Sequence, residues 1–286
     1  MSYELGIDFA SVDENTETPF AQAKSDGAGF VIVRASWGTW ADPTPASAAA
    51  AVRAAKLVYG AYIGPKIVVG QSAAAQVSTF AASAQLQRGV DLAPVIDIEF
   101  PSKISGTGMT RAQIATWLGE LVAAVKQTFG CLPIVYSSQR VLDTDDVDTL
   151  DGAADPQLVG CPLWLSRYPY AYDQPAQTSP SVLASLAPPP VPTSLGDADG
   201  WWIHQYQGDA RDFAGFNQVD CNRFNLASST TTGTRRAWLC ARLGIPSDTT
   251  PAELDAAIRS FQRAHSLGVD GIVGPQTFAA LSWQNY

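Results

Sequence analysis

The feature that most constrains this fold is the alternation of short apolar segments with alanine-rich segments along the first half of the chain. The alanine-rich segments 46–56 and 72–87 have the composition of helices, and each apolar segment has the length of one strand. Strands that alternate with helices pair in parallel, so the predicted fold class is α/β, a barrel or an open sheet. Eight candidate strands are found: Glu4–Asp8, Phe30–Arg34, Val58–Ile63, Ala93–Ile98, Pro133–Ser137, Pro162–Ser166, Trp201–Tyr206 and Gln218–Phe224.

The helical segments become fewer after about residue 165. Residues 169–200 are rich in Pro, Ser and Ala, and they are predicted to form a long surface loop because a strand-like segment follows them. The Ser- and Thr-rich stretch 228–234 is a better linker between domains. We therefore predict a barrel domain over 1–227, a linker over 228–234 and a small C-terminal domain over 235–286.

The C-terminal domain is predicted to contain three helices. Helical spacing runs over 235–243 and 251–266, and a third short helix follows a glycine-rich turn. Pro251 suits the first turn of its helix, with Thr249 or Thr250 as the capping residue.

The most informative segment is Pro94–Phe100, a hydrophobic strand that ends in two acids, Asp97 and Glu99. Side chains two positions apart share one face of a strand, so both carboxylates point the same way. In barrel enzymes the carboxyl ends of the strands carry the chemistry, although a strand end with incidental acids would look the same. The alternate residues are apolar, which predicts that the other face is buried: Ile96, Ile98 and Phe100.

Two more acids lie at equivalent places, Asp8 at the end of the first strand and Asp220 on the last. In a closed barrel these strands are neighbours, so four carboxylates are expected at one mouth. Repulsion and partial desolvation raise the pKa of some of them, and cleavage of a glycosidic bond requires one protonated acid beside an ionised one. Aromatic side chains, individually more typical of a core but able to stack on sugar rings, recur near the strand ends: Tyr62, Tyr136, Trp164, Tyr168, Trp202 and Tyr206.

Charge and residue counts exclude several function classes. The formal net charge of −9 argues against nucleic acid as a partner. The chain has two histidines and no closely spaced cysteine pair, so neither a metal site nor a cofactor is expected. No apolar run reaches transmembrane length, and the N-terminal residues lack the pattern of a signal peptide. We therefore expect a monomer that is made in the cytoplasm and does not insert into membranes.

Several short motifs occur in an order that is typical of one enzyme family. They are Gly6-Ile7-Asp8, Asp97-x-Glu99, Pro133-Ile134-Val135-Tyr136, Leu163-Trp164, Gln205-Tyr206 and Val219-Asp220-x-Asn222-Arg223-Phe224. Each motif is weak alone, but the ordered set resembles glycoside hydrolase family 25, which contains the Chalaropsis-type lysozymes, over roughly residues 3–226. The resemblance implies an irregular TIM-like (β/α) barrel whose last three strands lack full helices. It also implies N-acetylmuramidase activity on the β-1,4 bond between N-acetylmuramic acid and N-acetylglucosamine in peptidoglycan.

The resemblance also implies roles for the individual acids. Glu99 matches the general acid of the family, Asp97 the second catalytic carboxylate, and Asp8 and Asp220 the supporting acids. The family is a retaining one, and Asp97 either attacks the sugar or steadies the acetamido group of the substrate as the nucleophile. The residues expected to contact substrate are Tyr62, Tyr136, Trp164, Tyr168, Gln205, Tyr206 and Arg34.

The sequence departs from the family pattern at two places near the second and third strands. Residues 33–38 read Val-Arg-Ala-Ser-Trp-Gly where the family commonly has Lys-Ala-Thr-Glu-Gly, so Trp37 replaces an acid. Ile63 stands where the family often has histidine. Because the four acids remain, we expect activity with altered substrate subsites. The alternative is a catalytically inactive barrel that binds wall glycan, whereas an amidase or peptidase would need zinc ligands or a Cys–His pair.

The C-terminal domain resembles the peptidoglycan-binding domain type 1 family. The match rests on residues 258–277, which include Phe261-Gln262 and the turn Val269-Asp270-Gly271-Ile272-Val273-Gly274-Pro275. It implies a wall anchor that raises the local concentration of the barrel on an insoluble polymer. The two resemblances together imply a phage endolysin-like enzyme whose partner is the glycan strand of the bacterial cell wall.

Overall fold

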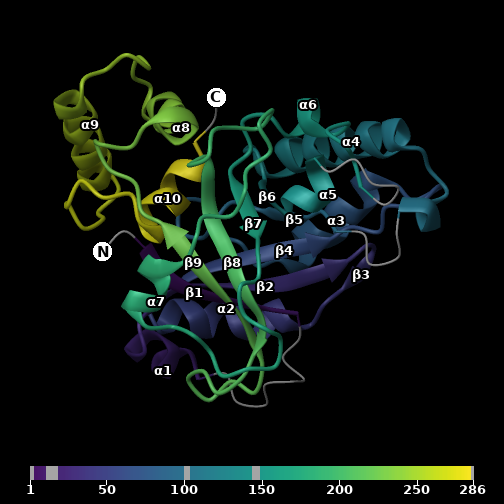
Figure 1. The fold of residues 1–286 in the computed structure, drawn as a ribbon, viewed down its shortest axis with the longest axis horizontal. Coiled ribbons are helices and arrows are strands. Elements are labelled where there is room, and N and C mark those ends of the chain that lie inside the picture. The colour runs from purple at the N-terminus through teal and green to yellow at the C-terminus, as the bar shows by residue number, and fades with distance from the viewer. Residues whose placement is uncertain (1–2, 11–18, 100–103, 144–148, 285–286) are drawn as a thin grey trace.

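The computed structural model describes residues 3–10, 19–99, 104–143 and 149–284, and the rest of the chain is drawn as a grey trace in Figure 1. Within these ranges the strands are β1 (Tyr3–Phe9), β2 (Ala28–Trp37), β3 (Trp40–Ala41), β4 (Val58–Gly64), β5 (Val95–Asp97), β6 (Ile134–Ser137), β7 (Leu163–Ser166), β8 (Trp201–Ala210) and β9 (Val219–Asn225).

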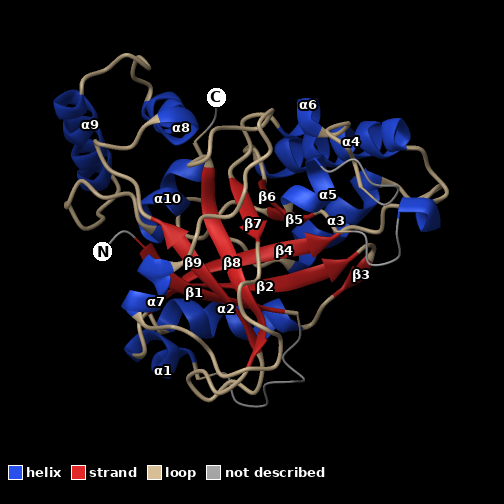
Figure 2. Cartoon of the chain, viewed as in Figure 1, coloured by secondary structure: helices blue, strands red, loops and turns tan. Residues whose placement is uncertain are grey.

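The strands form a closed barrel, which Figure 2 shows in red. The order along the sheet is β1-β9-β8-β7-β6-β5-β4-β2-β3, and an additional pairing of β1 with β2 closes it. The eight strands predicted from the sequence are all present in the barrel. Strand β3, which the sequence did not predict, pairs only with the end of β2 as a short hairpin.

One strand runs against the others. Strands β1, β2 and β4 to β8 pair in parallel, whereas β9 is antiparallel to both β8 and β1. No helix separates β8 from β9, so the connection is a hairpin, which requires antiparallel pairing. Strand β9 therefore begins at the mouth, the end of the barrel where the parallel strands finish.

Helices cover the first half of the barrel much more fully than the second, as the blue elements of Figure 2 show. The predicted helices 46–56 and 72–87 are α2 and α3, and the predicted loop 169–200 contains only the short helix α7. The helices of the barrel are α1 (Phe20–Ser25), α2 (Thr44–Ala54), α3 (Ala73–Ser83), α4 (Arg111–Phe129), α5 (Gln139–Asp143), α6 (Asp155–Leu158) and α7 (Pro180–Ser185), with a 3₁₀ turn at Ile104–Thr107. The predicted irregular barrel is thus confirmed.

Alternate side chains of the strands form two separate buried layers. On β2, Val31 and Val33 pack under the helices, whereas Phe30 and Ile32 point into the barrel. Phe30 meets Phe224 of β9 inside the barrel, with 6.1 Å between ring centroids. Large apolar side chains therefore fill the base, the end where the parallel strands begin, and polar side chains are left for the mouth.

Three helices make up the C-terminal unit, as predicted: α8 (Gly233–Leu243), α9 (Pro251–Ala264) and α10 (Pro275–Ser282). Thr250 caps α9 through a capping box with Glu253, in which each side chain binds the other residue's backbone N–H. The stretch expected as a linker is a compact turn, because Ser228 N–H donates to Thr231 Oγ1 at 2.9 Å. It ends where Thr234 N–H donates to Asp197 Oδ2 at 2.7 Å.

The C-terminal unit packs directly on the base of the barrel. The Phe278 ring of α10 lies 4.7 Å from Trp202 of β8 and 5.3 Å from Phe224, centroid to centroid. Trp283 Nε1 donates to the carbonyl of Asp91 at 2.7 Å, just before β5. Trp202, expected among the sugar-stacking aromatics, is therefore part of this shared core. In Figure 1 the arrows of β2 and β4 point away from the unit.

Within the described ranges, no helix is both long and apolar enough to cross a membrane.

Candidate active site

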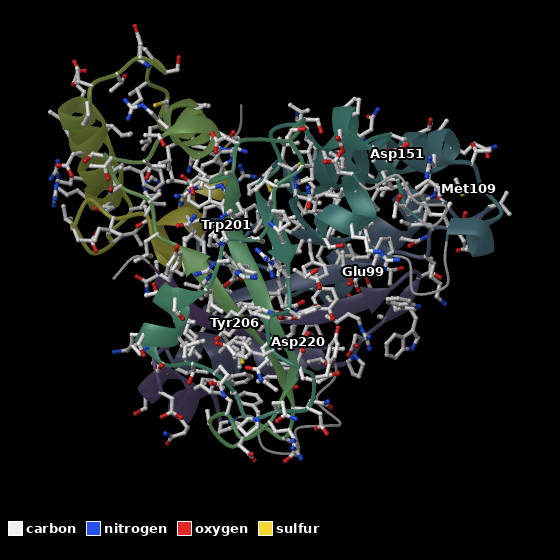
Figure 3. The ribbon with its side chains drawn as sticks, viewed as in Figure 1. Glu99, Met109, Asp151, Trp201, Tyr206 and Asp220 are labelled. Carbon is white, nitrogen blue, oxygen red and sulfur yellow. The ribbon has the colours of Figure 1, made fainter. Side chains whose placement is uncertain are left out.

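A pocket of about 300 Å³ lies at the mouth of the barrel, and it brings the four predicted acids together. Figure 3 labels Glu99, which follows β5, and Asp220 of β9. Eight of the eleven predicted site residues line the pocket: Asp8, Tyr62, Asp97, Glu99, Tyr136, Trp164, Gln205 and Asp220.

Strand β5 and its extension position the two central acids. Ile96 and Ile98 are both fully buried under the helices, as the alternation predicted. The backbone N–H of Ile98 donates to the carbonyl of Tyr136 at 2.8 Å, which prolongs the strand past Asp97. The side chains of Asp97 and Glu99 therefore both reach the pocket. Phe100, which was expected to continue the buried face, lies outside the described residues.

Asp8 and Asp220 face each other as a directly paired position of β1 and β9. Gln205 of β8 bridges the two carboxylates, because its Nε2 donates to Asp8 Oδ1 at 2.8 Å and to Asp220 Oδ2 at 3.0 Å. Asn222 Nδ2 also donates to Asp8 Oδ1, at 2.6 Å. The amide groups of Gln205 and Asn222 thus hold the two acids on the adjoining strands.

The same amides connect the acids to the aromatic wall. Gln205 Oε1 accepts from the Tyr136 hydroxyl at 2.5 Å and from the Tyr168 hydroxyl. Trp164 Nε1 donates to Asn222 Oδ1 at 2.8 Å. The motif around Asp220 contains Asn222, but no role was predicted for this residue from the sequence. Asn222 lies two positions after Asp220 on one strand, and this spacing could have predicted that it faces the pocket. Gln205 was predicted as a substrate contact, but each polar atom of its amide is engaged by protein groups.

The buried acids are held in a setting that favours their protonated forms. Burial is the largest cause that raises the pKa of Asp8 well above its usual value, and the charge of Asp220 adds to it. Burial also raises the pKa of Asp97 well above its usual value, with further contributions from Glu99 and Asp8. Arg34 opposes the rise at Asp97. The mouth is therefore a cluster in which not every carboxyl ionises at once.

Glu99 differs from Asp97 in its exposure to solvent. Its side chain is exposed, whereas that of Asp97 is only partly so. The carboxyl of Glu99 loses part of its hydration where it lies against the protein, and this raises its pKa. A hydrogen bond with the Tyr136 hydroxyl lowers the pKa. Among the described residues, Asp97 Oδ1 is buried without a hydrogen-bond partner. One carboxyl is thus open to solvent, and the other is partly buried, with one oxygen to which no protein group donates.

Three predicted site residues do not line the pocket. Arg34 binds Asp42 instead, with Nε 3.1 Å from Oδ2, so its guanidinium is occupied while its charge still acts on Asp97. Tyr206 points to the opposite side of β8 from Gln205, is fully buried, and donates to the carbonyl of Gln177 at 2.8 Å. The substrate contact expected of Tyr206 is therefore wrong, because adjacent residues of a strand face opposite sides. The Tyr168 hydroxyl is hydrogen-bonded to two residues of the lining, Tyr136 and Gln205.

A wider cleft adjoins the pocket. It encloses about 720 Å³ and shares Asp8, Tyr62 and Asp220 with the pocket. The two spaces therefore form one continuous depression across the mouth. Within the described ranges, no three His, Cys, Asp or Glu side chains are grouped as metal ligands. An elongated depression with acids at its centre can accommodate a polymer and transfer a proton to it.

Sequence comparison finds two families in the chain. The profile described as Glycosyl hydrolases family 25 matches residues 7–215, and the profile described as Putative peptidoglycan binding domain matches residues 243–281. The first match ends before Asp220 and Asn222, whose place at the mouth rests on the geometry. No curated protein matches the chain in sequence.

Solved structures share the fold of the barrel. The bacterial lysozyme from Streptomyces coelicolor is 22% identical with a TM-score of 0.62, and the match covers 78% of this chain and 92% of that chain. The muramidase from Trichobolus zukalii is 24% identical with a TM-score of 0.58, covering 78% and 93%. The muramidase from Acremonium alcalophilum is 21% identical with a TM-score of 0.60, covering 78% and 93%. These identities are low, so the likeness concerns the fold.

Proposed function

Because this chain belongs to glycosyl hydrolases family 25, we propose that it is an N-acetylmuramidase. It hydrolyses the β-1,4 bond between N-acetylmuramic acid and N-acetylglucosamine in peptidoglycan. The observation that carries this proposal is the pair Asp97 and Glu99, two acids in one pocket with unequal surroundings. Cleavage of a glycosidic bond needs two carboxyl groups that differ in protonation, and unequal burial is how proteins create that difference.

Glu99 acts as the general acid. Its raised pKa keeps a larger fraction protonated near neutral pH than an ordinary glutamate would have. The proton passes to the glycosidic oxygen as the bond to the anomeric carbon breaks. The solvent-exposed position of Glu99 then lets it regain a proton from water or activate the water that completes hydrolysis.

Asp97 supplies the second carboxylate of a retaining reaction. Its place in the lining of the pocket suits either of two roles, attack on the anomeric carbon or acceptance of the N–H of the substrate's acetamido group. Gln205 bridges Asp8 and Asp220, and the negative charge that this pair shares lies close to the positive charge that develops on the sugar ring. The packed rings of Tyr136 and Trp164, whose centroids are 4.6 Å apart, form the apolar wall against which the sugar lies.

The C-terminal unit anchors the enzyme on the wall. Its match to a peptidoglycan-binding profile supports this role. Together with the barrel it makes the chain an endolysin-type enzyme of the bacterial cell wall.

The decisive substitution is Glu99→Gln, which keeps the shape of the side chain and removes the acid. We expect release of reducing ends from purified peptidoglycan to fall by about a hundredfold to ten-thousandfold, since general acid–base catalysis contributes about 10²–10⁴-fold. Mass spectrometry of the wild-type digest should find N-acetylmuramic acid at the new reducing ends.

The control is cosedimentation of the same variant with purified wall, which should be unchanged because Glu99 is remote from the C-terminal unit. Full activity in Glu99→Gln refutes the assignment. A wild-type chain that binds wall but releases no reducing ends is instead the catalytically inactive glycan-binding protein.

A further inference from the structure

We propose that Trp37 and Trp40, on the hairpin of β2 and β3, form a platform on which a glycan strand stacks outside the catalytic pocket. The identity of the occupant rests on the proposed function, whereas the platform itself rests on the geometry of the hairpin. The two tryptophans lie in the segment where the sequence departs from the family pattern.

Strand β2 changes its register near the mouth. Arg34 pairs with Tyr62 of β4, and the pairing then shifts by one residue at Ala35. Such a bulge turns the following side chains and is common beside active sites. Here it brings Trp37 into register with Gly64, two residues beyond Tyr62 on β4.

The Trp37 ring lies on the inner face of the barrel sheet, the face on which the Tyr62 ring lines the pocket. Gly64 and Tyr62 are two positions apart on one strand, so a side chain at Gly64 would share the face of the Tyr62 ring, which lines the pocket. A Cβ on Gly64 would lie 2.3 Å from Cε3 of Trp37. The missing side chain of Gly64 therefore leaves the space in which the half-buried Trp37 ring lies.

Trp40 adds a second ring to the same face. It pairs directly with Trp37 across the hairpin, and directly paired residues of antiparallel strands project to one side. Its side chain is 53% exposed, the most exposed aromatic ring but one among the described residues. Large apolar side chains left open at the edge of a polar depression indicate a binding surface.

The hairpin is placed to continue the catalytic depression. Strand β2 lies between β1 and β4, which carry Asp8 and Tyr62, and both of these line the pocket and the adjoining cleft. A polymer whose scissile bond lies at Glu99 leaves the pocket toward a neighbouring rim, and this rim offers two indole rings.

The composition of the hairpin favours sugar over peptide as the occupant. Residues 35–41 include no charged side chain, and the aliphatic part of the Lys66 side chain lies against Gly38 of the hairpin, so the two rings themselves offer apolar contact and not ion pairs. Pyranose rings present flat C–H faces, and aromatic rings bind such faces by apolar contact. We therefore assign the platform to the β-1,4-linked glycan itself.

The test compares Trp40→Ala with Trp40→Phe on peptide-free glycan strands, sized into a tetrasaccharide fraction and a long-chain fraction. We expect KM for the long chains to rise about tenfold in Trp40→Ala, equivalent to about 1.4 kcal/mol of binding, with kcat retained. The tetrasaccharide should be affected little, and Trp40→Phe should keep most of the affinity. Val159→Ala, which truncates an exposed apolar side chain before β7, is the matched control.

A second measurement needs no turnover, so it separates the platform from the proposed function. Equilibrium binding of both fractions is measured for Glu99→Gln and for Glu99→Gln combined with Trp40→Ala. About tenfold weaker binding of long chains in the double variant supports the platform even if the wild-type chain proves inactive. Equal binding by the two variants, no binding by either, or a loss seen only with peptide-bearing wall fragments overturns the proposal.

Discussion

At the scale of single residues, Asp97 is where stability and chemistry conflict. Burial raises the pKa of its carboxyl, and Glu99 and Asp8 raise it further. A carboxyl whose folded pKa lies above its unfolded value binds more protons in the folded protein. Its contribution to stability is therefore complete below the unfolded pKa and is lost as the pH rises through the folded pKa. The free energy of unfolding should thus fall from mildly acid to neutral pH.

Asp97→Asn should therefore raise the thermal stability of the protein at neutral pH while abolishing activity. A gain of about 1 kcal/mol corresponds to about 3 °C in Tm for a chain of this size. The gain should shrink as the pH falls, and it should vanish below the unfolded pKa of about 3.9, where Asp97 is protonated in both the folded and the unfolded chain. Thermal unfolding followed by circular dichroism at neutral and acid pH measures it. Asp151→Asn, which changes an exposed carboxylate paired with Arg111, should show no comparable gain; a lower Tm for Asp97→Asn at neutral pH would contradict the argument.

At the scale of elements, the antiparallel strand β9 takes the place of a helix-covered parallel strand. Its buried Arg223 replaces the missing helix contacts, because Nη1 donates to the carbonyl of Leu183 at 2.7 Å and Nη2 to that of Ala187 at 2.9 Å. Nε donates to His204 Nδ1 at 3.1 Å. Burial lowers the pKa of His204 to about 4, so this ring stays neutral and can accept that bond.

Arg223→Lys should destabilise this side of the barrel strongly, because one ammonium group cannot reach three acceptors in different directions. Each lost bond to a charged donor costs about 1.5–3 kcal/mol, so we expect Tm to fall by more than about 5 °C. Denaturant unfolding gives the free energy directly. Arg211→Lys alters an exposed ion pair with Asp173 and serves as the comparison, with little expected change. Equal stability of the two variants would mean that Arg223 does not hold the segment around Leu183 and Ala187 against β9.

The sequence predicted most of the barrel because its signals are local. Short apolar strands, alanine-rich helices and acids at strand ends can be recognised in the sequence without knowing which segments pair in the fold. The direction of β9, the bulge at Ala35 and the burial of Tyr206 are not local. Each depends on which neighbour a strand pairs with, and a shift of one residue turns a side chain to the other face. Tyr206, the neighbour of Gln205 on β8, was misplaced for this reason.

At the scale of the whole molecule, the C-terminal unit and the barrel share one apolar core. Phe278 is fully buried between Trp202, Phe224 and Trp238, and the last of these belongs to α8. The base of the barrel is therefore covered by the unit rather than by solvent. Two units that share a core are expected to unfold together.

Phe278→Ala should consequently lower the Tm of the barrel as well as that of the C-terminal unit. Truncation of a buried phenylalanine costs about 3–5 kcal/mol. Calorimetry should find a single transition in the wild-type chain and in the variant, at a lower temperature in the latter. Ile272→Ala, in a more exposed part of the same unit, should change little. Two separate transitions, with only the smaller one displaced, would show that the units are independent.

The packing of α10 against the base also fixes the C-terminal unit relative to the mouth. The residues between the unit and the barrel form a compact turn and not an extended tether. We therefore expect one constant separation between the mouth and whatever the unit binds, where a flexible linker would allow a range of distances.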